Sequence, residues 1–322
     1  MTQLVVHLGY PKTATTTFQQ HVFPRHPEIE YLGKLIPSFR YRDERLFTEV
    51  DQLMTVDSLR YGGVGRLRQI VEEHRSNCDR PVLLVSSESF LHITAADPGI
   101  VAERIKAAFA PCKIIITLRE QRDMLRSFYG LHGRFGQYLF LCKWEMERLP
   151  FPLSLDEWLS FCFRAADKNY PSMLHYHEVV KRYRQLFGAD NVGVLLFEEL
   201  RSAPTSFVEK MFGFMGADAV TATALMGDHK ENESLSRTEW AWMRLSQVAR
   251  KRRIGDTMER RSQSTLYQWL SRTANKLDTT LPPHWEQRLN DWYGSGNRAL
   301  ANELGLPLRD YGYAGWPSSE GG

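Results

Sequence analysis

The sequence predicts an α/β fold in three layers, with a central parallel sheet flanked by helices. Short apolar runs typical of buried strands alternate with helical patterns, and this order favours parallel strands joined by helical crossovers. The run Lys113–Leu118 is almost entirely apolar and rich in isoleucine, as in a strand buried on both faces. With 43% hydrophobic and 25% charged residues among 322, the composition is that of an ordinary globular protein.

The individual elements follow from hydrophobic periodicity. Buried strands are predicted at residues 4–8, 82–86, 113–118 and 192–197, and helices at residues 13–23, 64–76, 99–109, 120–129 and 285–304. Residues 31–63 have mixed polarity, with Pro37, Gly62 and Gly63, and are expected to form an irregular excursion. Ser154 and Glu157 form a capping-box pattern ahead of another helix.

The first predicted strand leads into a loop that suits an anion. The strand ends at Gly9, and a turn carrying Lys12 precedes the next helix, whose N-terminal N–H groups attract phosphate. The loop is not the nucleotide-triphosphate motif G-x-x-x-x-G-K-[ST], because Lys12 follows Gly9 by three residues and no Gly-Lys pair comes after it. The alternative is a basic residue in an ordinary strand-to-helix turn.

A second anion-binding pattern follows the strand at residues 113–118. Arg119 stands at its C-terminal end, and Ser127 falls eight residues later on a predicted helix. A guanidinium group offers parallel donors to phosphate oxygens, and a hydroxyl group adds a third. A surface salt bridge is the simpler reading of an arginine at this place.

Together these segments resemble the sulfotransferases that use 3′-phosphoadenosine 5′-phosphosulfate (PAPS), of a bacterial, cytoplasmic type similar to both cytosolic and carbohydrate sulfotransferases. Residues 10–16 resemble the family's 5′-phosphosulfate loop, and Arg119 with Ser127 resembles its 3′-phosphate signature. A third segment, residues 191–216, resembles the family's late strand followed by a helix that closes at Gly216. The likeness covers residues 4–216 and implies a P-loop-like fold in a single domain, residues 1–322.

The resemblance implies that PAPS is the cofactor, that 3′,5′-bisphosphoadenosine is the product and that no metal is required. It implies that the cofactor is bound by these residues: Gly9, Tyr10, Pro11, Lys12, Thr13, Ala14, Thr15, Thr16, Thr17, Arg119 and Ser127. Two positions depart from the family. Ala14 stands where glycine is usual, and Thr17 stands where many cytosolic members have a tryptophan against the adenine.

A basic cluster at residues 250–261 lies in the C-terminal part, residues 228–322, which is expected to be mostly helical. Arg250 and Lys251 are candidate cofactor ligands on a lid, because cytosolic relatives place an Arg-Lys-Gly segment near this point. Arg252 replaces that glycine, so the match is partial, and a solvated helix end is the alternative. Nucleic-acid binding is disfavoured, because the cluster is short and no aromatic residues interleave it.

Sulfuryl transfer needs few catalytic groups. Lys12 is predicted to stabilise the negative charge that develops on the bridging oxygen. Glu88, after the strand at residues 82–86, is the predicted general base, since glycan-modifying relatives generally use a glutamate; His92 is the reserve candidate. A strand-end residue that caps the next turn is the alternative for Glu88.

The acceptor is predicted to be a hydroxyl group on a sugar or glycolipid, with a small alcohol or phenol as the alternative. This rests on Glu88 and on the helical insertion at residues 130–190, which is expected to contribute to the acceptor side with the aromatic residues Tyr138, Phe140, Trp144 and Trp158. The rival functions are a P-loop kinase and a non-catalytic nucleotide-binding module.

The cellular context follows from three further features. The first strand starts at Leu4, which leaves no room before it for a signal peptide, and no run reaches the length of a membrane span. Four widely spaced cysteines favour free thiols in a reducing compartment. The sequence therefore favours a cytoplasmic enzyme, and it gives no oligomeric state.

Overall fold

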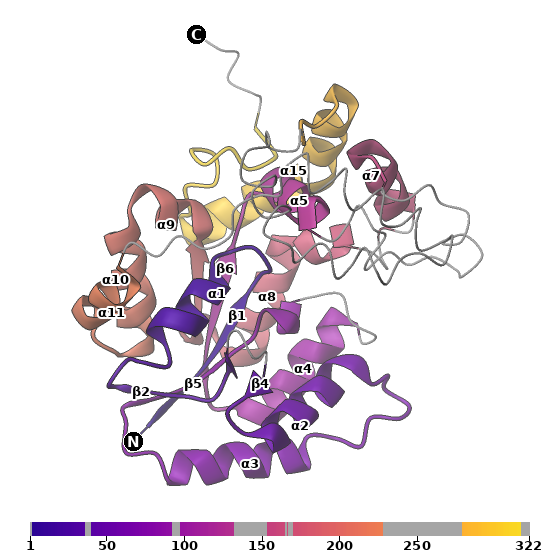
Figure 1. The fold of residues 1–322 in the computed structure, drawn as a ribbon. Helices are drawn as coiled ribbons and strands as arrows, with labels where there is room; N and C mark the ends of the chain where they lie inside the picture. The colour runs from indigo at the N-terminus through magenta and orange to yellow at the C-terminus, as the bar shows by residue number, and fades with distance from the viewer. Residues whose placement is uncertain are drawn as a thin grey trace, which may run out of the picture. The chain divides into compact units, whose positions relative to one another are not determined.

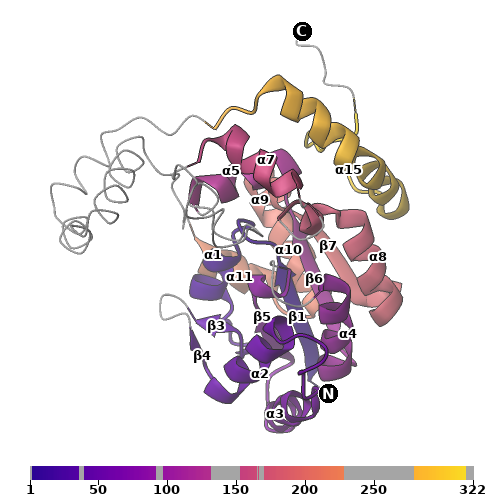
Figure 2. The same cartoon turned by 90° about the vertical axis from the view of Figure 1, so that its right-hand side faces the viewer.

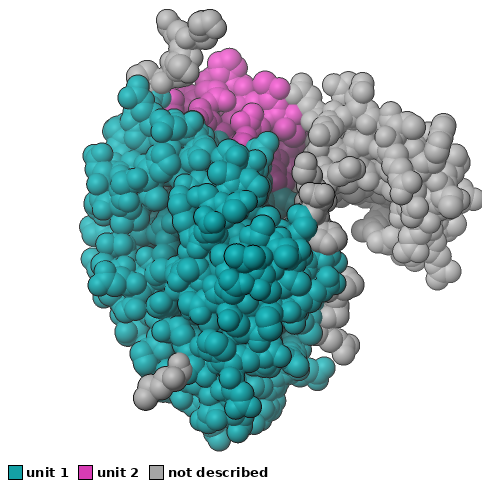
Figure 3. Space-filling view, turned by 90° about the vertical axis from the view of Figure 1, so that its left-hand side faces the viewer, with its two compact units in different colours: residues 1–120, 173–231, 293–322 teal, residues 121–172, 232–292 magenta. Residues whose placement is uncertain are grey.

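The computed structural model describes residues 2–35, 40–91, 97–131, 153–164, 166, 170–227 and 279–316. The chain forms two compact units, which Figure 3 colours teal and magenta. The first unit consists of residues 1–120, 173–231 and 293–322, and the second consists of residues 121–172 and 232–292.

A parallel five-stranded sheet forms the centre of the first unit, which confirms the predicted α/β fold (Figure 1). Its strands, in spatial order, are β2 (Ile29–Tyr31), β5 (Val82–Ser86), β1 (Gln3–Gly9), β6 (Lys113–Leu118) and β7 (Val192–Leu196). Four of them are the strands that the sequence predicts. β2 has only three residues, too few to display a periodicity, and β7 ends one residue early because Phe197 begins a helix.

Helices cover both faces of this sheet. One face carries α1 (Thr15–Thr17), the π-helix η1 (Phe18–Val22), α9 (Phe197–Ser202), α10 (Pro204–Met215) and α11 (Ala219–Met226). The other face carries α2 (Glu44–Thr55), α3 (Gly65–Ser76), α4 (Pro98–Phe109) and α8 (Tyr176–Phe187), with α4 beside α8 (Figure 2). The 3-10 helices η2 (Glu88–Leu91) and η6 (Ala189–Asn191) are among the short connecting elements.

Side chains alternate between the two faces of each strand, and this alternation explains how the first face of the sheet binds its helices. Val5 on β1, Leu84 on β5 and Ile115 on β6 point to the same side of the sheet and are buried against η1, α10 and α11. Aromatic side chains fill much of this layer: Phe18, Phe23, Phe207 and Phe212. The sheet and its first helices are therefore held by a continuous apolar core, and burial of each large side chain contributes about 1.5–3 kcal/mol.

Residues 31–63 are more regular than the sequence suggests. They contain the antiparallel pair β3 (Lys34–Leu35) and β4 (Arg40–Tyr41), and the 12-residue helix α2. Asp43 caps α2, since its carboxylate accepts a hydrogen bond from the backbone N–H of Arg45 at 2.8 Å. The apolar stripe of α2 consists chiefly of Leu46, Val50 and Leu53 among polar residues, and it lies in a segment bounded by Pro37, Gly62 and Gly63, which are typical of loops.

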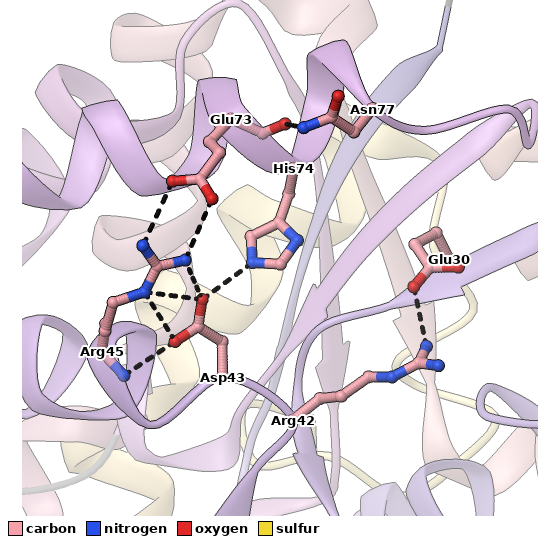
Figure 4. Close-up of polar contacts among 7 residues, drawn as sticks. All are labelled: Glu30, Arg42, Asp43, Arg45, Glu73, His74 and Asn77. Carbon is pink, nitrogen blue, oxygen red and sulfur yellow. Dashed lines mark hydrogen bonds and ion pairs between the residues drawn. The ribbon is translucent and has the colours of Figure 1, made fainter.

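Charged side chains fasten α2 to α3 (Figure 4). The guanidinium group of Arg45 donates to Asp43 and to Glu73, and His74 Nε2 lies 3.0 Å from Asp43 Oδ2. The hydrogen bonds from Arg45, outweighing partial burial, hold the pKa of the Asp43 carboxyl well below its ordinary value. These contacts are mostly exposed and contribute orientation more than stability.

The second unit contains α5 (Gln121–Leu131) and α7 (Leu155–Arg164). The predicted capping box is present: Ser154 Oγ accepts from the backbone N–H of Glu157, whose carboxylate accepts from the backbone N–H of Ser154 at 2.7 Å. Two further elements, the 3-10 helix η5 (Tyr170–Leu174) and α15 (Pro283–Leu304), run from one unit into the other. In the described part of the chain, no helix is both long and apolar enough to cross a bilayer.

Candidate active site

The loop between β1 and α1 has a strained backbone. Lys12 and Ala14 both have positive φ, at 72° and 59°. Ala14 thus holds the left-handed conformation at the position where the family pattern has glycine, at a cost of about 1 kcal/mol for its Cβ. Its carbonyl accepts from the N–H groups of Thr17 and Phe18, so the strained residue starts the helix.

Hydroxyl groups brace the same loop from inside. Thr13 Oγ1 donates to the carbonyl of Tyr10 at 2.6 Å and lies 3.2 Å from Thr15 Oγ1. Tyr10 is fully buried, and its hydroxyl donates to the carbonyl of Met173. A Cβ on Gly9 would lie 2.3 Å from Thr15 Oγ1, so only glycine lets the loop close over the end of β1.

Replacement of Gly9 by alanine is expected to destabilise the fold by about 1–3 kcal/mol, the usual cost of overpacking, and to weaken binding of 3′,5′-bisphosphoadenosine. Chemical denaturation and calorimetry measure the two effects. The matched control is Gly213→Ala on α10, where a Cβ meets nothing within 4 Å; it should leave affinity unchanged and raise stability slightly. Equal behaviour of the two variants would contradict a closed loop at Gly9.

Two basic residues come close in the fold just past the ends of β1 and β6, Lys12 and Arg119. Arg119 Nη1 donates to the carbonyl of Lys12 at 2.9 Å, and the Arg119 guanidinium lies 4.9 Å from the ring centre of Phe197. Burial and the charge of Arg119 lower the pKa of Lys12 from its ordinary 10.5 to about 8. The sheet thus brings together two predicted ligands that stand 107 residues apart, and the proximity of two positive charges favours the binding of an anion.

The surroundings of Arg119 contain residues that the sequence analysis missed. Tyr176 Oη donates to the Arg119 carbonyl at 2.6 Å, and Glu198 Oε1 accepts from the backbone N–H of Glu120 at 2.8 Å. The second oxygen of Glu198 accepts from Tyr313 Oη at 3.0 Å. Burial raises the pKa of Glu198 despite these hydrogen bonds. Tyr313 lies 194 positions beyond Arg119 in the sequence, so no local pattern signals such a role.

Other predicted ligands are not brought together here. Ser127 lies on α5 in the second unit, so its predicted pairing with Arg119 joins the two units and stays a prediction. Arg250 and Lys251, with the rest of the basic cluster at 250–261, lie outside the described residues, as does His92.

Glu88 lies on η2, just past the end of β5, and both of its carboxylate oxygens accept hydrogen bonds. Lys34 Nζ lies 2.7 Å from Oε1, and Gln19 Nε2 lies 3.3 Å from Oε2. Burial by itself raises the pKa of the Glu88 carboxyl, but the charge and hydrogen bond of Lys34 outweigh it, so the pKa lies below the ordinary value. The side chain is therefore an ionised acceptor at neutral pH.

A buried polar chain connects this carboxylate to the middle of the sheet. Gln19 Nε2 also lies 3.1 Å from Ser86 Oγ, which is 2.9 Å from Nδ1 of His7. The register of β1 on β5 places His7 directly beside Ser86. Burial lowers the pKa of His7 to about 4, although the charge of Glu88 opposes this, so the imidazole is neutral at pH 7. In the sequence, the signal for this chain was the presence of polar residues, His7 and Ser86, in two strands that are otherwise mostly apolar.

Comparisons with known proteins identify the family. A family model described as "Sulfotransferase domain" matches residues 3–293. The chain therefore belongs to the sulfotransferase family, and it is a PAPS-dependent transferase with a P-loop-like α/β fold. No curated protein sequence matches it.

One solved structure shows the likeness in fold, and two further structures align with lower scores. A sulfotransferase from Alicyclobacillus acidocaldarius aligns with a TM-score of 0.50 and 17% identity, over 97% of this chain and 98% of its own. Mouse sulfotransferase SULT7A1 complexed with PAP aligns with a TM-score of 0.37 and 14% identity, over 71% and 68% of the two chains. The sulfotransferase domain from the curacin biosynthetic pathway aligns with a TM-score of 0.41 and 12% identity, over 68% of this chain and 75% of its own.

Proposed function

We propose that this enzyme transfers a sulfuryl group from PAPS to a hydroxyl group on a sugar or glycolipid, with Lys12 and Glu88 as its catalytic residues. PAPS supplies the activated sulfuryl group when it is bound. The observation that supports the proposal is the contact of the Arg119 guanidinium with the backbone of Lys12, in a loop that Gly9 allows to close.

The proposed ligands fit a doubly phosphorylated nucleotide. Lys12 and the loop residues 9–17 would bind the 5′-phosphosulfate end, because the loop combines an ammonium group with the start of a helix. Arg119 would bind the 3′-phosphate, since a guanidinium fork matches a phosphate group. Ser127, Arg250 and Lys251 are proposed as additional ligands on the strength of the family resemblance.

The proposed chemistry assigns one task to each catalytic residue. As the bond to sulfur breaks, negative charge grows on the bridging oxygen, and the Lys12 ammonium stabilises it. Glu88 accepts the proton from the acceptor hydroxyl. A sulfonate carries less charge than a γ-phosphate, so we propose that no metal takes part.

The sugar or glycolipid acceptor rests on Glu88. Of the four aromatic residues that the sequence suggests for the acceptor side, Trp158 is fully buried and packs against Phe128, which makes it a core residue. Tyr138, Phe140 and Trp144 lie outside the described residues. A screen with ³⁵S-labelled PAPS against glycosides, alcohols and phenols tests the acceptor class. Transfer to phenols alone would contradict a sugar or glycolipid acceptor.

The cytoplasm is the proposed location of the enzyme. The described cysteines, Cys78, Cys112 and Cys162, are free thiols, as is usual in a reducing compartment.

Binding selectivity tests the cofactor site directly. Because Arg119 should contact the 3′-phosphate, 3′,5′-bisphosphoadenosine is expected to bind at least tenfold more tightly than 5′-AMP, as a hydrogen bond to a charged group is worth about 1.5–3 kcal/mol. Calorimetry measures both affinities, and Arg119→Ala should remove most of the difference. Equal affinities, or tighter binding of ATP with magnesium, would overturn the assignment in favour of a kinase or a nucleotide-binding module.

A further inference from the structure

The segment that carries Lys34 is held tightly against the end of β5. The backbone N–H of Leu32 donates to the carbonyl of Leu84 at 2.9 Å, and Tyr31 Oη donates to the carbonyl of Lys34 at 2.7 Å. Between them, a Cβ on Gly33 would lie 2.6 Å from the carbonyl oxygen of Ser86. Glycine therefore permits an approach that fixes the backbone of Lys34 beside the strand that leads to Glu88.

The side chains of Lys34 and Glu88 form a partly buried ion pair. Lys34 Nζ lies 2.7 Å from Glu88 Oε1, and only 17% of the Lys34 side chain and 23% of the Glu88 side chain are exposed. The other carboxylate oxygen of Glu88 accepts a hydrogen bond from Gln19, which lies on the π-helix η1 after the loop that begins at Gly9. Donors from two separate elements thus fix the direction of the carboxylate, and low exposure strengthens the pairing relative to a surface ion pair.

We propose that Lys34 is a positioning residue for sulfuryl transfer, whose ammonium group orients the Glu88 carboxylate and keeps it ionised. The inference rests on the proposed role of Glu88 as general base. In a loose transition state the attacking oxygen has formed little bond to sulfur, so its proton leaves late. A permanently ionised and well-directed acceptor is then more useful than a stronger base whose orientation varies.

Among the described residues several titratable groups act on Glu88, and Lys34 is the one that forms an ion pair with it. His7 on β1 is neutral because burial lowers its pKa to about 4. Tyr31 on β2 and Tyr41 on β4 are neutral because burial raises their pKa values above the ordinary range. Removal of Lys34 should therefore leave burial as the dominant influence and raise the pKa of the Glu88 carboxyl.

The pH dependence of turnover distinguishes positioning from a merely structural role. With the best acceptor from the screen above and saturating PAPS, Lys34→Met should lower turnover at pH 7 by about 10–100-fold and move the acidic midpoint of the profile to higher pH. Lys34→Arg should restore the midpoint. Lys210→Met is the matched control, because Lys210 on α10 forms an ion pair with Glu199 on α9 at the same distance, 2.7 Å. The pH profile of this variant should match that of the wild type.

Unfolding experiments provide a readout that needs no acceptor. A carboxyl whose folded pKa is lowered contributes stability above its unfolded pKa, and that contribution is lost as the pH falls through the folded pKa. The stability difference between the wild type and Lys34→Met should therefore shrink on acidification. In a Glu88→Gln background the same Lys34→Met change should show no such pH dependence.

The outcomes separate the inference from the function on which it rests. An acidic midpoint that stays in place in Lys34→Met, while Glu88→Gln is inactive, overturns the positioning role alone. Normal turnover in Glu88→Gln overturns the base and, with it, the inference. Failure of the wild type to bind 3′,5′-bisphosphoadenosine overturns the proposed cofactor site. A shifted midpoint that Lys34→Arg restores, together with pH-dependent coupling to Glu88, supports the inference.

Discussion

Lys12→Ala is expected to lower turnover at saturating PAPS by about 10²–10³-fold, the usual effect of removing one preorganised donor from developing charge. Binding of 3′,5′-bisphosphoadenosine should weaken less, because the loop N–H groups and Arg119 remain. Steady-state kinetics and calorimetry separate the two effects. Lys181→Ala, at an exposed position on α8, is the control and should keep normal turnover. Near-normal turnover in Lys12→Ala would refute the assigned role.

The same lysine predicts a pH dependence. Burial and the neighbouring Arg119 charge lower the pKa of Lys12 to about 8 in the free enzyme. The ammonium form binds the anion, so affinity for 3′,5′-bisphosphoadenosine should decline as the pH rises through that value. Lys12→Ala should lack this decline, and calorimetry between pH 6.5 and 9.5 would follow it.

Glu88→Gln is expected to reduce sulfuryl transfer by about 10²–10⁴-fold, the usual contribution of a positioned general base. Glutamine keeps the shape and one acceptor oxygen but takes up no proton, so cofactor affinity should survive. The matched control is Glu49→Gln on α2, a buried glutamate paired with Arg66 at 3.3 Å, which should retain turnover. Loss of cofactor binding in Glu88→Gln would instead indicate a structural role.

His92 is the competitor for this role. Normal turnover in Glu88→Gln combined with an inactive His92→Ala would transfer the base to His92. The argument for a sugar or glycolipid acceptor, which depends on a carboxylate base, would then lose its support.

The sequence predicted the parts of the fold whose signals are local. The apolar runs at residues 82–86 and 113–118 could be recognised because a strand buried on both faces needs no partner to define its pattern. The capping box at Ser154 and Glu157 is likewise a contact three residues apart. The two-residue strands at 34–35 and 40–41 were missed because such elements exist only through their pairing.

The candidate site likewise contains features that the sequence predicts and features that depend on the tertiary structure. By itself the sequence determined the family, the glycine-and-lysine loop at residues 9–17 and the candidates Arg119 and Glu88, since each follows a strand end that periodicity locates. Only the tertiary structure decided that Lys34 pairs with Glu88, that Gln19 holds its other oxygen and that Arg119 lies against Lys12. These contacts join residues 54, 69 and 107 positions apart. Sheet register and helix packing determine them, and no short sequence pattern encodes either.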